Sequence, residues 1–399
     1  MNTIKDIFRI GYGPSSSHTM GPRRAANIFK QKHSECQIFK ITLYGSLAAT
    51  GRGHFTDVAL TEELKPSRVE IVWEPKTYLP EHPNGIKFEA IDNNGNTIDS
   101  WKTFSVGGGA LWEEMNSGAI SVYPHKNMKE ILEYLEKSGK SFWEYVEEFE
   151  GKEIWDYMSE VWKAMQETIR TGLENDGVIP GPLHLPRKAS QYFTKSHGFS
   201  GSLKRKTSLF AYALAVSEEN ASGGKVVTAP TCGSCGVLPA VLYHISKDYE
   251  MPDQRIIKAL ATAGLFGNII KTNASISGAE VGCQGEIGSA CAMASAASAK
   301  LFGGTTTQIE YAAEIGLEHH LGLTCDPIGG FVQIPCIERN AFGAARALDA
   351  SAFAILSDGH HHVSFDKVVE TMNITGHDIP SLYKETSIGG LAKIVGETE

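Results

Sequence analysis

The chain has 399 residues, of which 42% are hydrophobic and 21% are charged, and its formal net charge is -9. This size and composition are ordinary for a folded enzyme of two or three domains. An acidic chain without a run of basic residues argues against nucleic acid or a membrane as the main partner, so we expect a small-molecule substrate.

The N-terminal segment indicates the compartment. Lys5, Asp6 and Arg9 interrupt its apolar residues, so no signal peptide is expected, and the sequence has no run of about 18 apolar residues that would suit a membrane span. We therefore expect a cytoplasmic protein. In a reducing compartment its seven cysteines are expected to be thiols, metal ligands or redox centres rather than disulfides.

The first 110 residues predict a sheet-bearing domain. The stretches "QIFKITLYGSL" and "RVEIVW" are rich in strand-forming residues, and "IKFEAIDNNGNTIDSWKTFSV" has the pattern of two strands around an Asn-Gly turn. A mixed α/β domain is the expected result.

The rest of the chain predicts helices. Apolar residues recur at three-and-four spacing from Ile154 to Ile169, and the polar stretch between Gly172 and Thr207 is long enough for a crossing or active-site loop. Further on, "GEIGSACAMASAASAKLFGG" and "NAFGAARALDASAFAIL" are helical segments whose small residues allow close packing. We therefore predict an α+β protein, with a mixed α/β domain over residues 1–150 and an all-helical catalytic domain over residues 151–399.

Glycine-rich segments that also carry polar side chains are the candidates for chemistry. They are "GPSSSHTMGP", "GSLAATGRGHFTD", "APTCGSCG", "KTNASISGAEVGCQGE" and "CDPIGGFVQIPCIERN". Glycine lets a backbone approach a ligand closely, and hydroxyl, amide and imidazole groups suit a carboxylate or an amine. Ser15, Ser16 and Ser17 either cap a helix that begins near Met20 or bind a carboxylate at its N-terminus, and the two roles are compatible.

The histidines allow two interpretations. Taken alone, His18 and His54 have either a structural or a catalytic role. The three adjacent histidines at 360–362 resemble a metal-binding tract, but neighbours on a helix cannot all face one ion, so we expect them at a solvated surface.

Four of the cysteines give little direction. Cys36 and Cys291 sit in ordinary surroundings and are expected to be buried thiols. Cys232 and Cys235 form a C-x-x-C, which is typical of a redox pair or of metal ligands, but a single such motif is a weak signal.

The other three cysteines lie in glycine-rich, turn-prone contexts. They are Cys283, Cys325 and Cys336. Three loop cysteines suit an iron-sulfur cluster better than a core, and a cube with three thiolates would leave one iron open as a Lewis acid.

With these segments in view, the chain resembles the iron-sulfur-dependent bacterial L-serine dehydratases, or L-serine ammonia-lyases, in their single-chain form. "IGYGPSSSHTMGP" and "LYGSLAATGRGHFTD" are similar to the family's β domain, and "NASISGAEVGCQGE", "CDPIGGFVQIPCIERNA" and "YKETSIGGLA" are similar to its helical α domain. The resemblance implies a lyase that converts L-serine to pyruvate and ammonia without pyridoxal phosphate. It further implies a homodimer with a role in amino-acid degradation and gluconeogenesis.

The resemblance also implies the site. A 4Fe-4S cluster would be held by Cys283, Cys325 and Cys336, with the substrate's carboxylate and hydroxyl at the open iron. The candidate bases are Lys271, His18 and His54. The residues expected to hold the substrate's carboxylate and amine are Ser15, Ser16, Ser17, Thr19, Asn273, Ser275 and Ser277, and Glu286 would orient a ligand loop.

The chain departs from the family pattern at Cys232 and Cys235, where many members have residues such as Asn and Ala, so no role for these two thiols carries over. Three other functions stay open. They are an iron-sulfur β-eliminase acting on L-cysteine, a pyridoxal-phosphate dehydratase with Lys271 as its Schiff-base lysine, and a cluster-bearing redox sensor that uses Cys232 and Cys235.

Overall fold

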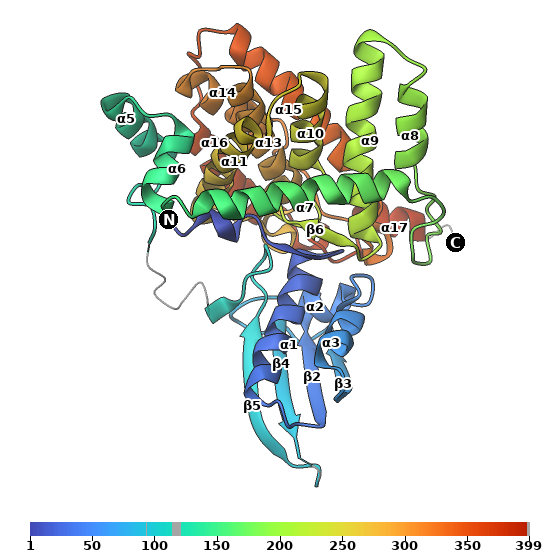
Figure 1. The fold of residues 1–399 in the computed structure, drawn as a ribbon. Coiled ribbons are helices and arrows are strands. Elements are labelled where there is room, and N and C mark those ends of the chain that lie inside the picture. Colours follow the sequence, from blue (N-terminus) through green and yellow to red (C-terminus); the bar gives the residue numbers. More distant parts are fainter. Residues whose placement is uncertain (93, 114–120, 397–399) are drawn as a thin grey trace.

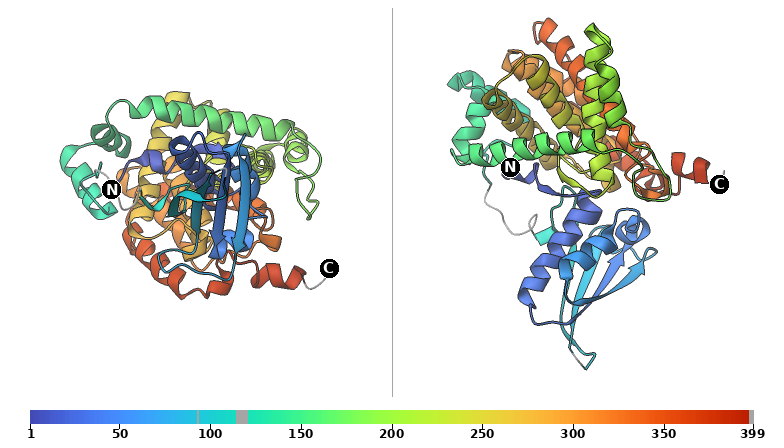
Figure 2. Two further views of the ribbon diagram at one scale, coloured as in Figure 1. Left: turned by 90° about the horizontal axis from the view of Figure 1, so that it is seen from below. Right: turned by 45° about the vertical axis from the view of Figure 1, so that its right-hand side comes forward.

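A computed structural model describes residues 1–92, 94–113 and 121–396. A small α/β domain projects from a larger helical domain (Figure 1). Two further views show that the small domain meets the helical domain at one end of its sheet, so the loops at that end face the helices (Figure 2). The predicted α+β class is confirmed.

The small domain is built on a four-stranded sheet in the order β3-β2-β4-β5. The strands are β2 (Ile38–Tyr44), β3 (Arg68–Glu74), β4 (Gly85–Ile91) and β5 (Thr97–Phe104), and β2 and β3 are parallel while the other two pairs are antiparallel. These are the strands that the sequence predicts.

One face of this sheet is covered by α1 (Gly21–Lys32), α2 (Gly45–Thr50) and α3 (Thr56–Leu64) (Figure 1). Alternate residues of a strand point to one face, which sends Phe39 of β2 and Phe88 of β4 into this core. There they contact the ring of Phe29 from α1, with ring centroids 5.9 and 5.5 Å away respectively.

The larger domain is dominated by helices that pack around a buried centre. Helix α13 consists mostly of small residues, and nearly all of its side chains are buried. Small side chains let the neighbouring helices pack closely against it. The helices are α5 (Met128–Ser138), α6 (Phe142–Glu150), α7 (Ile154–Glu174), α8 (Ala189–Ser196), α9 (Gly201–Ala221), α10 (Val237–Asp248), α11 (Asp253–Asn273), α12 (Gly278–Val281), α13 (Ser289–Leu301), α14 (Thr306–Glu318), α15 (Cys336–Leu356), α16 (Phe365–Asp378) and α17 (Gly390–Gly396). Short helical turns lie at η1 (Ile4–Asp6), η2 (Ser16–Met20), η3 (Gln284–Gly288), η4 (Ile328–Gly330) and η5 (Ser381–Tyr383).

The two largest hydrophobic cores divide the chain differently from the predicted boundary at residue 150. The chain's first residues, including Ile4 and Phe8, belong to the helical core, as do α5 and α6. The core of the small domain runs from Ala25 to Leu111. Strand β1 (Ile10–Tyr12) also pairs antiparallel with β6 (Lys225–Val227), so the larger domain is not all-helical as expected.

The stretch predicted as a loop between Gly172 and Thr207 is partly helical. The end of α7, all of α8 and the start of α9 fall inside it, which leaves residues 175–188 as the true connection. This connection contacts the segment between Cys325 and Cys336. There the Gln333 side-chain amide donates a 2.9 Å hydrogen bond to the carbonyl of Pro180. Within the described ranges, no helix is long and apolar enough to cross a membrane.

Candidate active site

The serine-rich loop forms the N-terminal turn of η2, which continues into α1. The hydroxyl of Ser15 accepts a 3.1 Å hydrogen bond from the backbone N–H of His18, so the predicted capping role is confirmed. Thr19 locks the loop to the next one, because its hydroxyl donates a 2.6 Å bond to the carbonyl of His54. All five residues from Ser15 to Thr19 are buried.

The loop brings His18 against His54. Both side chains are completely buried, and their ring centroids lie 4.5 Å apart. Burial lowers the pKa of His18 to about 4, and burial followed by the neighbouring His18 lowers the pKa of His54 well below its ordinary value. Both imidazoles are therefore neutral near pH 7 and able to accept a proton.

A third member of this group comes from the helical domain. The carboxyl of Glu385 lies 3.8 Å from Nδ1 of His18, and the Ser46 hydroxyl reaches the Glu385 carbonyl at 3.5 Å. Burial, and then the nearby Glu286, raises the pKa of Glu385 to about 8, so this carboxyl is mainly protonated near pH 7. The two domains thus contribute to one polar cluster.

The three predicted cluster ligands converge behind Glu385. Cys283 precedes η3, Cys325 follows α14, and Cys336 is the first residue of α15. None of the three thiols is in a disulfide. After burial and nearby carboxyls, Cys283 and Cys336 raise the pKa of Cys325, and Cys283 also raises that of Cys336, so the three thiols lie within electrostatic range of one another. The backbone ties Cys325 to Glu385, whose N–H donates a 2.8 Å bond to the Cys325 carbonyl.

The residue type of these three ligands is the one that iron-sulfur clusters use in proteins. Burial raises the pKa of the Cys283 thiol to about 11. The Arg339 guanidinium lowers this pKa through its charge and through a hydrogen bond to the Cys283 sulfur. Cys283 and Cys336 stand where helical segments begin, and helix N-termini and an arginine both favour thiolates. Among the described side chains, the sulfurs of Cys283, Cys325 and Cys336 do not all lie within 4.8 Å of one another.

Two further groups support the cysteines. The carboxyl of Glu286, buried beside them, accepts a 2.7 Å hydrogen bond from the Thr231 hydroxyl. Gly278 passes close to Cys325, since a Cβ there would lie 3.2 Å from the Cys325 sulfur and 3.0 Å from Glu286. A larger residue at position 278 would therefore press on the side chains of both Cys325 and Glu286.

The three substrate-binding candidates between residues 271 and 277 lie in different surroundings. Ser277 is buried beside Gly278, and its hydroxyl has no hydrogen-bond partner in the part of the chain that the structure describes. Ser275 instead donates to Glu280. Asn273 is exposed and donates to the backbone carbonyls of Lys126 and Ile269, at 2.8 and 3.0 Å.

Lys271 lies in another place. Its amine is 3.6 Å from the Asp6 carboxylate, in a cavity of about 260 Å³ that it lines with His82 and Glu280. None of the three cluster cysteines lines this cavity. Lys271 therefore lies apart from the cysteines, in contact with Asp6.

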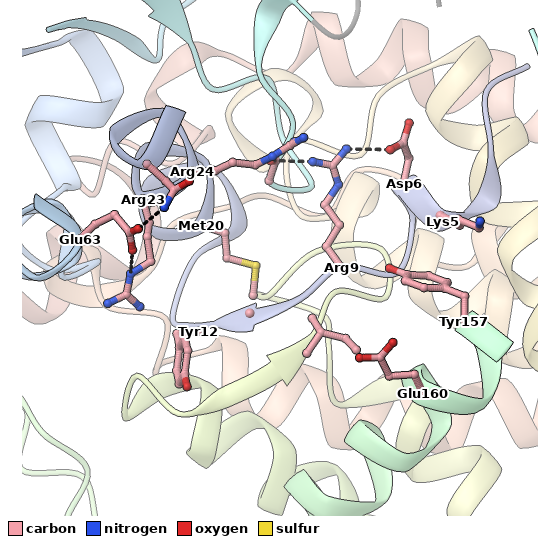
Figure 3. Close-up of a pocket in the computed structure, with 14 residues that line it drawn as sticks. Lys5, Asp6, Arg9, Tyr12, Met20, Arg23, Arg24, Glu63, Tyr157 and Glu160 are labelled. Carbon is pink, nitrogen blue, oxygen red and sulfur yellow. Dashed lines mark hydrogen bonds and ion pairs between the residues drawn. The ribbon is translucent and has the colours of Figure 1, made fainter. Parts of the chain in front are cut away.

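A larger cavity of about 670 Å³ lies between α1, β1 and α7 (Figure 3). Arg9 reaches across it to the Asp6 carboxylate at 2.8 Å, and Arg23 lies 3.4 Å from Glu63. Neither His18 nor any cluster cysteine lines the cavity. Because it lacks these groups, it is not the candidate reaction site.

The predictions for the remaining cysteines and histidines are only partly confirmed. Cys36 and Cys291 are buried, as expected. Cys232 and Cys235 are buried too, and the sulfur of Cys232 lies 3.7 Å from that of Met20. Of the three adjacent histidines, the outer two are exposed, but His361 is half-buried, stacks on Tyr311 and pairs with Glu310 at 2.7 Å.

Comparisons with known proteins identify the family. A family profile described as "Serine dehydratase beta chain" matches residues 3–70, and one described as "Serine dehydratase alpha chain" matches residues 89–392. The chain belongs to the serine dehydratase family. It is 39% identical to the L-serine dehydratase of Haemophilus influenzae, over 99% of this chain and 100% of the relative. It is 40% identical to L-serine dehydratase 1 of Escherichia coli, over 98% and 99% respectively, and 40% identical to the L-serine dehydratase of Streptomyces coelicolor, over 98% of each.

In this member of the serine dehydratase family, one residue of the polar cluster and one residue near it were not predicted from the sequence. Glu385 lies within the quoted motif "YKETSIGGLA" but received no role. His82 is buried, accepts a 3.1 Å hydrogen bond from the Asn84 N–H at Nδ1, and acts electrostatically on His18. Its signal was only a histidine in the turn "PEHPNG", which has no catalytic pattern of its own.

Proposed function

We propose that this protein dehydrates L-serine to pyruvate and ammonia at the junction of its two domains, with a 4Fe-4S cluster on Cys283, Cys325 and Cys336. The observation that carries the proposal is the meeting of two neutral, buried histidines with Glu385, near which lie the buried thiols of Cys283 and Cys325 and the half-buried thiol of Cys336. The names of the relatives support the substrate and the lyase class.

The chain's own side chains can supply binding and proton transfer. The N-terminus of η2, with its serine hydroxyls, suits the substrate's carboxylate, because free N–H groups and the helix dipole favour an anion. His54 is the better candidate for removing the α-proton, since neither ring nitrogen is hydrogen-bonded within the described ranges. His18, held by Ser17 and Ser46, would orient the substrate beside it.

The bound cluster would supply a Lewis-acid iron for the hydroxyl and carboxylate of the substrate. Loss of a proton and of hydroxide from serine gives an enamine. The enamine tautomerises to an imine, and water then replaces its nitrogen to give pyruvate and ammonia. The protein's part is to keep His54 neutral until the substrate arrives, which its burial favours.

The test is a comparison of substrates with protein that has been reconstituted anaerobically with iron and sulfide. We expect the highest kcat/KM for pyruvate release from L-serine, with L-threonine and L-cysteine much slower. A higher kcat/KM for L-cysteine would favour the β-eliminase. Inactivation by borohydride would favour the pyridoxal-phosphate route, and a bound cluster without turnover of any of the three would favour the sensor.

The cellular setting is proposed from the resemblance alone. We propose a cytoplasmic homodimer that acts in amino-acid degradation and gluconeogenesis. The oligomeric part is checked by the mass of the reconstituted protein in solution.

A further inference from the structure

One cluster of potential metal ligands stands apart from the cysteines. His18, His54 and Glu385 each offer one ligand atom, and these atoms all lie within 4.8 Å of one another. Within the described part of the chain, this is the one group of at least three His, Cys, Asp or Glu side chains whose ligand atoms lie this close together. All three side chains are buried, so bulk water does not compete strongly for them.

The environment of His18 fixes its ring in the form that a ligand needs. Its Nε2 lies 3.3 Å from the carbonyl oxygen of Ser46, which can only accept, so Nε2 carries the proton. Nδ1 is then unprotonated. It accepts a 2.8 Å hydrogen bond from the Ser17 hydroxyl, which a metal ion would displace, and it lies 3.8 Å from the Glu385 carboxyl. A histidine that binds a metal through one nitrogen commonly donates the other N–H to a backbone carbonyl.

His54 supplies an independent observation. It is completely buried, and neither Nδ1 nor Nε2 has a hydrogen-bond partner among the residues that the structure describes. A buried polar group without a partner costs about 1–3 kcal/mol. A ligand that takes a lone pair of His54 would remove this cost without breaking any existing hydrogen bond.

We propose that His18, His54 and Glu385 form a mononuclear site for a zinc-type divalent cation, and that this ion excludes the substrate. Two imidazoles and one carboxylate are a known three-ligand set for zinc, with a fourth position open to water. Calcium and magnesium prefer oxygen ligands, and iron(II) binds nitrogen and oxygen sites more weakly than zinc does. Exclusion of the substrate rests on the proposed function, because there the same histidines contact L-serine.

The experiment uses the reconstituted holoenzyme and zinc chloride as the probe. After anaerobic desalting we expect about one zinc per chain, and zinc-edge X-ray absorption should show nitrogen and oxygen ligands at about 2.0–2.1 Å rather than sulfur at about 2.3 Å. Saturating L-serine should displace the ion, and zinc should raise KM for L-serine without lowering kcat.

Matched variants separate this site from others. His54→Gln and Glu385→Gln should each lower zinc affinity at least about tenfold, which is about 1.4 kcal/mol, while keeping the iron content of the parent. His361→Gln removes a different histidine paired with a glutamate, 2.7 Å from Glu310, and should bind zinc like the parent.

Three outcomes would overturn the inference. They are zinc ligated by sulfur, zinc affinity unchanged in both site variants, and no zinc retained after desalting. If L-serine turns over normally while zinc fails to bind, this inference alone is wrong. If zinc binds through nitrogen and oxygen but no L-serine is dehydrated, the metal site stands and the proposed function is wrong.

Discussion

At the scale of single residues, the proposed reaction depends on His54 as a base. Removing a positioned general base typically costs about 10²–10⁴-fold in rate. We therefore expect His54→Gln to lower kcat by that range while the iron and sulfide content stays unchanged, measured by pyruvate release and metal assay on one preparation. A variant with an intact cluster and parental kcat would remove His54 from the mechanism.

The pH profile tests the state of the histidines. Because burial chiefly lowers the pKa of His18 to about 4, and lowers that of His54 as well, both stay neutral as the pH falls through the ordinary histidine range. We expect kcat/KM for L-serine to change less than about twofold between about pH 7 and 5.5. A base with an ordinary pKa near 6.5 would instead give a drop of roughly eightfold.

The sequence could predict part of the site. Cys283, Cys325 and Cys336 stood out because glycine-rich loops around cysteines are unusual in a core, and Ser15 stood out as a helix cap. Glu385 did not stand out, because its role comes from a tertiary contact with His18 across more than 360 residues of chain. Lys271 was a candidate by residue type, and only its packing beside Asp6 shows where it lies.

At the scale of elements, α8 depends on a buried carboxyl. Glu218 of α9 accepts hydrogen bonds from the backbone N–H groups of Lys188 and Ala189, at 2.7 and 3.3 Å, where α8 begins. Burial raises the pKa of Glu218 from 4.5 to about 7 despite these bonds.

This raised pKa gives a signed prediction. Below about pH 4.5 both the folded and unfolded forms are protonated, and as the pH rises toward 7 only the unfolded form releases its proton, so stability falls. Glu218→Gln keeps a hydrogen-bond acceptor and cannot ionise. Between about pH 4.5 and 7 we therefore expect its Tm to rise relative to that of the parent, as its free energy of unfolding exceeds the parent's by up to about 3 kcal/mol. Parallel Tm curves would contradict this, and the exposed Glu370→Gln is the control.

Elements were predicted where their patterns are local. The strands of the small domain and helix α7 follow from periodicity within a few residues. Helix α8 was missed because its segment is polar and flanked by prolines, and its first turn is completed by Glu218 from another helix.

At the scale of the whole molecule, the active site requires the two domains to touch. A Cβ on Gly53 would lie 2.9 Å from the backbone oxygen of Gly330, in the segment between Cys325 and Cys336. Gly53→Ala should therefore push the neighbouring His54 out of place, and a displacement of this kind can cost about 10²-fold in kcat/KM.

The matched control for this prediction is Gly198→Ala. A Cβ there meets only the Lys195 oxygen, at 3.5 Å, so kcat/KM and Tm should not change. Gly53→Ala should also leave the iron content unchanged, because the cysteines belong to the helical domain. Parental kcat/KM in Gly53→Ala would show that this domain contact does not position the base.

The domain division was the least predictable feature from sequence. Ile10 pairs with Val227, and the first residues pack with α5 and α6, so the helical core draws on segments far apart in the chain. Neither hydrophobic periodicity nor composition carries information on such long-range pairing. The helical pattern begins at Asn127 in the sequence, and α5, which starts at Met128, packs in the helical core.

The central claim is that turnover of L-serine requires a cluster on the three cysteines. The most direct measurement is the rate of pyruvate formation per chain as iron and sulfide are added anaerobically, with bound iron counted in each sample. We predict that the rate is absent without iron, rises in proportion to bound cluster, and is lost in Cys325→Ala but kept in Cys291→Ala. Pyruvate formation from L-serine by iron-free protein, or at the parental rate by Cys325→Ala, would contradict the account.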